Sequence, residues 1–226
     1  MGKRILAAIS RWIPQHVPNG LVLRIYDLLC IHRTAASMRA DPCLCTADTS
    51  PAGYMEDQRH RREETFGRST VAAAGCEVIA VYNALVYFYG GERIPFPALV
   101  HLFSRSGMAL GGRFGTSPLA LVRFFSRWWR DGAWKTEFVT DRRLFDRIAR
   151  EYPCLIVSFY NDGEDIRRGV HTVCMTRGDR GWTAHNLTEN GRTAGPFADV
   201  SHMLTGTAGR HRHGLCVLGL YKPPNS

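Results

Sequence analysis

The chain has 226 residues and carries 29 Lys and Arg against 20 Asp and Glu, which gives a formal net charge of +9 at pH 7. Hydrophobic residues make up 45% of the chain, which excludes a wholly disordered or low-complexity protein and predicts one large domain with at most a small attachment. Residues 1–75 carry 10 basic and 7 acidic side chains and residues 76–226 carry 19 and 13, so the two parts contribute +3 and +6. This even spread, without a finger or a basic-zipper pattern, argues against a nucleic-acid partner.

The first part of the chain predicts two helices, Ile5 to Ile13 and Leu21 to Met38, separated by a cluster of Pro, Asn and Gly at 14–20. Both are amphipathic and basic. Such helices pack on their own domain or lie on an anionic membrane surface, here through residues 4–38, and we favour packing. No window of about twenty apolar residues occurs, so we expect no membrane span and a cytoplasmic location.

An irregular segment from Asp41 to Tyr54 contains two prolines and a glycine and marks the predicted boundary. We therefore expect a helical prefix with its linker at residues 1–50 and a domain at residues 51–226. Helices come first in this domain: Glu77 to Tyr89, Phe96 to Ser104, Ser117 to Trp129 and Arg142 to Glu151. The first of them is apolar around most of its surface, which predicts a central, buried helix.

Strands follow the helices. Four runs are rich in β-branched, aromatic or apolar residues and are bounded by turn residues: Cys154 to Tyr160, Val170 to Thr176, Gly181 to Leu187 and Gly214 to Tyr221. Helices first and strands second predict an α+β domain with an antiparallel sheet.

Seven cysteines lie mostly inside apolar runs: Cys30, Cys43, Cys45, Cys76, Cys154, Cys174 and Cys216. An odd number in such positions argues for reduced thiols in a cytosol and against a disulfide framework. The single residue between Cys43 and Cys45 is not zinc-ligand spacing, so we expect no metal. The Gly111 to Gly115 loop lacks the preceding strand of a nucleotide-binding fingerprint, so we expect no cofactor.

Cys76 stands where a run of small residues ends and the predicted central helix begins. Unpaired backbone N–H groups and the positive end of the helix dipole favour a thiolate there and can donate to an oxyanion. A nucleophilic cysteine also needs a base. Taken alone, however, a cysteine at such a position is also typical of a buried core.

His171 opens an apolar strand directly after Gly169-Val170, which places its imidazole at a strand end. Asn186 follows fifteen residues later, on the next predicted strand. A strand, a tight turn and a return strand bring such positions side by side, so Asn186 can orient the His171 ring. His185 is a rival for the base, and each residue alone also has an ordinary structural interpretation.

This order of Cys76, His171 and Asn186 resembles the papain-like cysteine peptidases, particularly the small bacterial domains related to peptidases that process double-glycine leader peptides. The resemblance covers about 67–221. It implies a papain-like fold, a thiolate–imidazolium pair of Cys76 and His171, and Asn186 as orienting residue. It also implies attack on an acyl carbonyl, a thioester intermediate and hydrolysis.

Two positions depart from the family pattern. The family commonly has an oxyanion glutamine about six residues before the nucleophile, but this chain contains only Gln15 and Gln58. Ser69 or Thr70 would substitute, or the Cys76 amide would act with another donor. Glu77 stands where glycine is common, and a carboxylate turned toward the sulfur would raise the pKa of Cys76.

Three functions are consistent with these residues. The first is a cysteine-dependent hydrolase that cleaves a peptide or other amide. The second is an acyltransferase or transglutaminase-like enzyme that uses the same Cys–His pair, and the third is a catalytically silent papain-like binding module. The sequence predicts neither the substrate's identity nor the oligomeric state.

Overall fold

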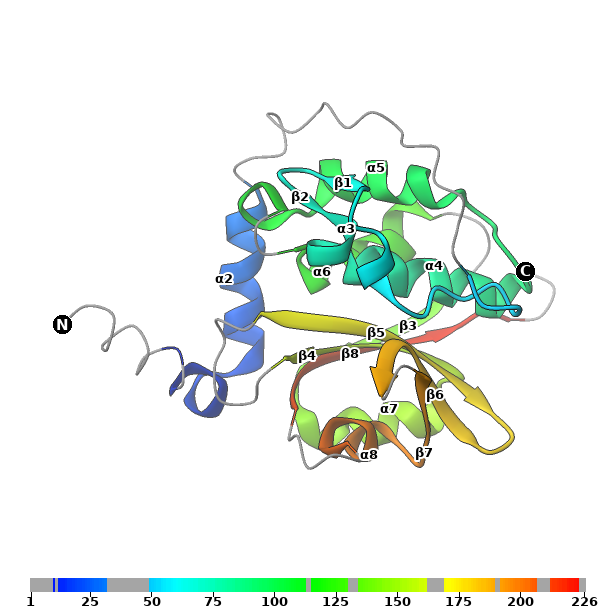
Figure 1. The fold of residues 1–226 in the computed structure, drawn as a ribbon. Helices are drawn as coiled ribbons and strands as arrows, with labels where there is room; N and C mark the ends of the chain where they lie inside the picture. Colours follow the sequence, from blue (N-terminus) through cyan, green and yellow to red (C-terminus); the bar gives the residue numbers. More distant parts are fainter. Residues whose placement is uncertain are drawn as a thin grey trace.

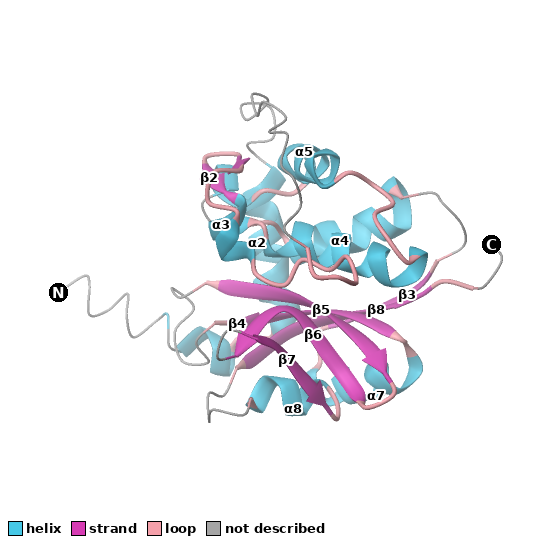
Figure 2. Ribbon diagram, turned by 45° about the vertical axis from the view of Figure 1, so that its right-hand side comes forward, coloured by secondary structure: helices cyan, strands magenta, loops and turns pink. Residues whose placement is uncertain are grey.

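The computed structural model describes residues 10, 12–31, 49–112, 115–129, 134–161, 169–189, 192–206 and 212–223. The chain folds into an α+β domain, as the order of elements predicted. One antiparallel sheet of six strands runs through its middle, and helices cover both faces of the sheet (Figures 1 and 2).

The sheet has the strand order β3-β8-β4-β5-β6-β7. Its strands are β3 (Lys135–Val139), β4 (Cys154–Tyr160), β5 (Val170–Gly178), β6 (Gly181–Glu189), β7 (Arg192–Phe197) and β8 (His213–Tyr221). All seven residues of β4 are buried, because this strand lies inside the sheet and is covered on both faces. That position explains its continuous apolar run.

Side chains alternate between the two faces of the sheet. Ile156 and Cys174 pack in the cluster that contains α4 (Cys76–Tyr89), whereas Val157 and Val173 pack in the cluster under α7 (Phe145–Glu151) and α8 (Val200–Thr205). Two hydrophobic cores therefore sandwich the sheet. This alternation fixes which face each polar residue of β5 reaches.

Helix α4 is the central helix, as predicted. Every residue from Cys76 to Val86 is buried, and the helix ends at Gly90, whose left-handed φ of 72° forms the C-cap. Each fully buried aliphatic side chain of this helix stabilises the fold by about 1.5–3 kcal/mol. Helix α4 therefore holds its first two residues, Cys76 and Glu77, in defined positions.

The other elements on this face are α3 (Val71–Ala74), α5 (Phe96–Ser106), α6 (Pro118–Arg123), the short hairpin of β1 (Thr65–Phe66) and β2 (Ser69–Thr70), and the turns η1 (Gln58–His60) and η2 (Ala109–Gly112). Residues 117–129 were predicted as one helix. The structure divides them into α6 and the π-helical turn η3 (Phe124–Trp128), in which Phe124 packs edge to face against Phe125.

The predicted helix at 142–151 is likewise divided, into the 3-10 turn η4 (Arg142–Leu144) and α7. All four predicted strands are present. Two further strands of the six-stranded sheet, β3 and β7, were not predicted, and neither were the hairpin of β1 and β2, α3 and α8.

Of the helical prefix, α2 (Asn19–Ile31) is described. Leu23 and Cys30 are buried against the domain, and Asp27 accepts two hydrogen bonds from Arg123 of α6, at 3.0 and 2.8 Å. Helix α2 therefore packs on its own domain. Its outer face, with Leu21, Ile25, Leu28 and Leu29, is 42–57% exposed.

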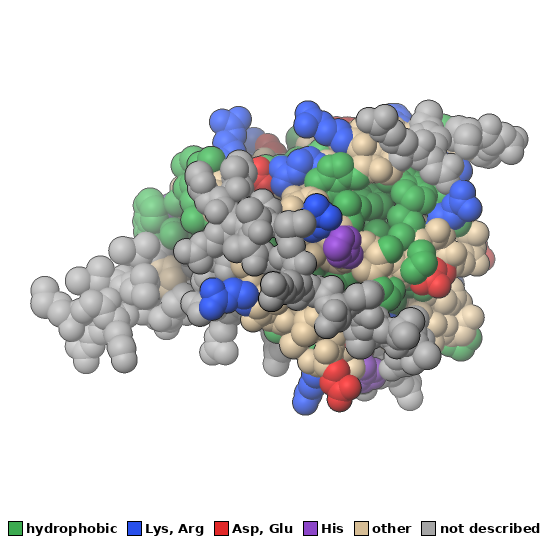
Figure 3. Space-filling model, turned by 90° about the horizontal axis from the view of Figure 1, so that it is seen from above, with side chains coloured by type: hydrophobic (Ala, Val, Ile, Leu, Met, Phe, Trp, Pro, Cys, Tyr) green, Lys and Arg blue, Asp and Glu red, His purple; other side chains and the backbone are tan. Residues whose placement is uncertain are grey.

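Most of the predicted helix at 5–13, the part of the second helix beyond residue 31, the linker up to residue 48, and Cys43 and Cys45 lie outside the described residues. In the described part of the chain, no helix is long and apolar enough to cross a membrane. On the face shown in Figure 3, Lys and Arg side chains are scattered around a hydrophobic area, in keeping with the spread of charge along the sequence.

Candidate active site

Cys76 is the first residue of α4, directly after a sharp break in the backbone. Gly75 separates α3 from α4, and a Cβ at Gly75 would lie 2.7 Å from Cγ1 of Val71 and 2.8 Å from its carbonyl oxygen. Only glycine therefore fits this junction. The junction turns Cys76 inward, and only 5% of this residue is exposed.

The Cys76 thiol is hydrogen-bonded to its neighbour in the sequence. Its Sγ donates to Oε2 of Glu77 at 3.1 Å. Burial raises the pKa of Cys76, and the charge of Glu77 and this hydrogen bond raise it further, while the backbone amides of Thr172 and Glu77 oppose the rise. Burial and Glu77 together therefore favour the neutral thiol form of Cys76, in the direction that the sequence predicted.

Glu77 lies in a buried polar network between α4 and the sheet. The residue is 2% exposed, and Thr172 of β5 donates from Oγ1 to its Oε1 at 3.3 Å. The Thr172 hydroxyl also lies 2.9 Å from the hydroxyl of Ser158 on β4. Burial raises the pKa of Glu77 to about 7, although hydrogen bonds from Cys76, Thr172 and the backbone lower it.

Helix α2 closes another side of this network. Burial raises the pKa of Tyr26, and the negative charge of Glu77 raises it further. A Cβ placed on Gly115 would lie 3.7 Å from Oε2 of Glu77 and 3.9 Å from the hydroxyl of Tyr26. The tyrosine therefore stands close to the carboxylate, and the prefix forms part of the wall around Cys76.

His171 lies near the start of β5, as predicted, and is paired with Asn186 of β6. Its Nε2 lies 2.7 Å from the backbone oxygen of Asn186. A carbonyl only accepts, so Nε2 carries the hydrogen and Nδ1 is the basic nitrogen of the neutral ring. Burial lowers the pKa of His171, which favours this neutral form.

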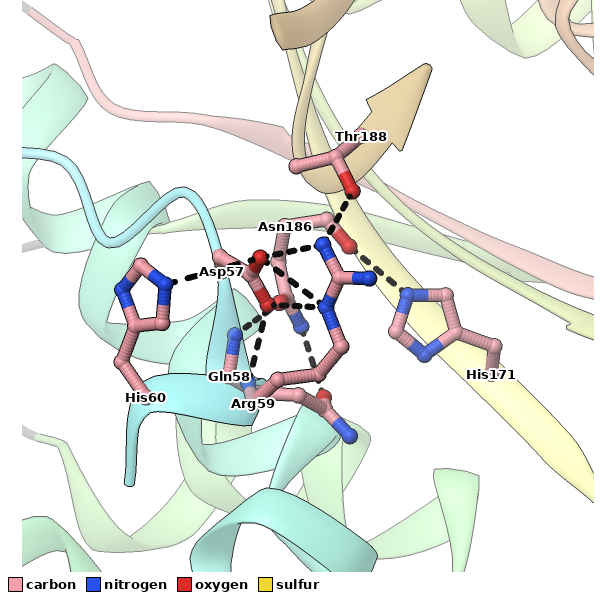
Figure 4. Close-up of polar contacts among 7 residues, drawn as sticks. All are labelled: Asp57, Gln58, Arg59, His60, His171, Asn186 and Thr188. Atoms are coloured by element: carbon pink, nitrogen blue, oxygen red, sulfur yellow. Dashed lines mark hydrogen bonds and ion pairs between the residues drawn. The ribbon is translucent and has the colours of Figure 1, made fainter. Parts of the chain in front are cut away.

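The pairing of β5 with β6 ends just before this contact. The ladder runs to Cys174 opposite His185, and Asn186 then takes a left-handed φ of 63°. This torsion breaks the alternation along β6, because the side chain of Asn186 turns to Gln58 instead of following the strand pattern. The His171 side chain bridges the gap that the missing ladder leaves (Figure 4).

Gln58 is a site residue that the sequence did not indicate. The backbone N–H of Gln58 donates to Oδ1 of Asn186 at 3.0 Å, and Nδ2 of Asn186 donates to Oε1 of Gln58 at 2.9 Å. Nε2 of Gln58 donates to the carbonyl oxygen of Ala72 at 2.9 Å. Gln58 thus ties β6 to α3, four residues before Cys76. The family pattern placed a glutamine near the nucleophile in sequence, whereas this one arrives from a distant turn.

The predicted residues are only partly brought together. His171 and Asn186 are in contact, but the hydrogen bonds of Cys76 go to Glu77 and Thr172 and not to His171. The reason is the alternation of β5: Thr172 reaches Glu77 on the α4 face, whereas the His171 ring stands edge-on to Phe159 of the opposite core, with centroids 5.6 Å apart.

Ser69 and Thr70, the predicted oxyanion donors, form β2 and pair with β1. Thr70 precedes α3 without a side-chain hydrogen bond to cap it. Among the described hydrogen bonds, none joins either side chain to Cys76. The Cys76 sulfur instead accepts hydrogen bonds from the backbone amides of Thr172 and Glu77.

His185, the rival base, is engaged on both ring nitrogens. Its Nδ1 lies 2.9 Å from Oε1 of Glu56, its Nε2 lies 2.9 Å from Oγ1 of Thr176, and Tyr54 stacks on the ring with centroids 3.8 Å apart. The residue is 4% exposed. These contacts give His185 a structural role.

The exposed side of the site is polar. Arg59 of η1 pairs with Asp57 and donates to Oγ1 of Thr188 at 3.1 Å, close to His171 (Figure 4). The described residues contain no group of three or more His, Cys, Asp or Glu side chains that would hold a metal ion. All five described cysteines, Cys30, Cys76, Cys154, Cys174 and Cys216, are free and buried.

Comparison of the chain with known protein families, curated proteins and solved structures gave no match. The papain-like resemblance therefore stays a prediction from Cys76, His171, Asn186 and their order.

Proposed function

We propose that the protein is a cysteine-dependent hydrolase that cleaves a peptide or other amide bond, on a papain-like α+β fold. Cys76 is the nucleophile, His171 is the general base and acid, and Asn186 orients His171. Two contacts at the start of α4 and β5 support this proposal. The Cys76 sulfur contacts the amide of Thr172, the residue next to His171, and His171 is held in a defined tautomer by Asn186.

The proposed reaction begins with transfer of the Cys76 proton to Nδ1 of His171. The thiolate then attacks the acyl carbon, the C–N bond breaks, and the amine leaves with the proton from His171. Water, deprotonated by the same ring, hydrolyses the thioester. In the described structure the His171 ring lies on the face of β5 opposite to the sulfur, so the first step requires a rearrangement at the start of β5 that brings the ring to the α4 face.

The test is alkylation of the native protein with iodoacetamide at neutral pH, with each modified cysteine located by mass spectrometry. We expect His171→Ala to slow the labelling of Cys76 by about tenfold or more, because the proton acceptor is lost. Cys76→Ala identifies the labelled site, and His101→Ala, an exposed helical histidine, is the matched control. Labelling of Cys76 at the same rate in wild type and His171→Ala would refute the assignment of His171.

A second candidate is a catalytically silent binding module on the same fold. It is favoured by the hydrogen bond of Cys76 to Glu77 and by the position of His171 on the other face of β5. If the enzyme proposal holds, product masses with and without an added amine distinguish hydrolysis from acyl transfer, since the two products differ in mass.

A further inference from the structure

The pair of Cys76 and Glu77 has a chemistry that the proposed reaction does not use. A carboxylate oxygen 3.1 Å from a thiol sulfur accepts its proton as a hydrogen bond and opposes ionisation of the sulfur. Both residues are almost completely buried, so water screens this interaction little. The side chain of Glu77 is held in place by Thr172 of the sheet and by the backbone of Thr116.

We propose that Glu77 is a built-in restraint on Cys76, which keeps the sulfur in its unreactive thiol form until the carboxylate loses its charge or moves away. The inference rests on the proposed function in so far as Cys76 is taken as the nucleophile. The restraint itself concerns only the ionisation of the thiol. It acts whether or not His171 is the base.

The groups that face Glu77 decide how the restraint responds to pH. They are Cys76 on α4, Tyr26 and Cys30 on α2 and Cys216 on β8. Burial raises the pKa of Cys30 and of Cys216 to about 12, and the pKa values of Cys76 and Tyr26 are raised as well. Glu77, with a pKa of about 7, is therefore the member of this group that changes charge between pH 5 and 9.

A defined pH profile follows for the alkylation of Cys76. Below pH 7 Glu77 is neutral, and the thiolate fraction rises tenfold per pH unit as for an isolated thiol. Above pH 7 each further thiolate forms against the charge of Glu77, so the rate of the wild-type protein levels off. In Glu77→Gln the restraint is absent and the rate continues to rise.

The experiment compares iodoacetamide labelling of Cys76 in wild type, Glu77→Gln and the control Glu151→Gln, which changes a carboxylate on α7 beyond the sheet, from pH 5.5 to 9. We expect Glu77→Gln to react about tenfold faster than wild type at pH 8.5 and at a nearly equal rate at pH 6. Glu151→Gln should match wild type throughout.

Two outcomes would overturn the restraint: a rate ratio that does not change with pH, or slower labelling in Glu77→Gln, which would make Glu77 a base. Cys154 and Cys174 report on the integrity of the variant, because both are buried in the same core. If Cys154 and Cys174 also become reactive in Glu77→Gln, the test depends on the wild-type protein alone. The restraint then requires the rate of Cys76 labelling in wild type to level off above about pH 7. A loss of His171 dependence without loss of this levelling-off would refute the proposed base and leave the restraint intact.

Discussion

Replacement of Glu77 by glutamine tests how the protonation of this buried carboxyl group changes the unfolding free energy with pH. The folded protein holds the pKa of Glu77 at about 7, against an ordinary value of 4.5. Between these values the folded state binds more protons than the unfolded state, so stability falls as the pH rises from about 4.5 to 7. The difference of 2.5 units corresponds to about 3 kcal/mol of unfolding free energy, at about 1.36 kcal/mol per unit.

The glutamine variant lacks this titration. Its unfolding free energy, relative to wild type, should therefore rise by about 3 kcal/mol between pH 4 and pH 8, whatever constant offset the substitution introduces. Denaturant unfolding at a series of pH values, followed by circular dichroism, measures the difference directly. For the exposed Glu151→Gln we expect a variation with pH below about 0.5 kcal/mol. A difference between Glu77→Gln and wild type that is flat from pH 4 to pH 8 would refute the argument that burial controls Glu77.

Two further substitutions test the geometry around the site. Asn186→Ala should lower the unfolding free energy by about 3–4 kcal/mol, because alanine disfavours the left-handed φ by about 1–2 kcal/mol and two hydrogen bonds of about 1 kcal/mol each are lost. Asn186→Gly accepts that φ and should lose about 1–2 kcal/mol less in the same denaturation experiment; equal losses would contradict the role of the torsion. Gly219→Ala on β8 would place its Cβ 2.6 Å from Cγ of Tyr152, and we expect a loss of about 1–3 kcal/mol from overpacking. An unchanged melting temperature for Gly219→Ala would show that α7 moves away without penalty.

The sequence predicted the interior of the sheet better than its edges. Strands β4 and β8 carry long apolar runs because a hydrophobic core covers each face of the sheet at these strands. Within the six-stranded sheet, the two strands that were missed, β3 and β7, are the two edge strands. β3 contains Lys135 and Glu137 within five residues, and β7 contains Gly195 and Pro196, which are residues that an edge tolerates and an interior strand does not.

The candidate site shows a similar division. The helix start at Cys76 and the proximity of His171 and Asn186 follow from local patterns and a hairpin of the expected length. The face of β5 on which the His171 ring lies depends on its register with β4, where Thr172 is opposite Ser158. A shift of one residue would exchange the two faces, and no local pattern around His171 determines that register.

The contacts of Gln58 could not be predicted from the sequence for a related reason. Gln58 comes from an exposed, charged turn, and its contacts with Asn186 and Ala72 depend on how three separate segments pack. Glu77, in contrast, was recognised as a departure because it is adjacent to Cys76.

The left-handed torsion of Asn186 gives one residue two duties. The same peptide unit ends the ladder between β5 and β6 and supplies the oxygen that holds His171. The length of the pairing between β5 and β6 and the orientation of the His171 ring therefore depend on the same backbone torsion. A sequence change that lets residue 186 follow the strand pattern would extend the pairing of β5 with β6 and move the carbonyl oxygen away from the imidazole at the same time.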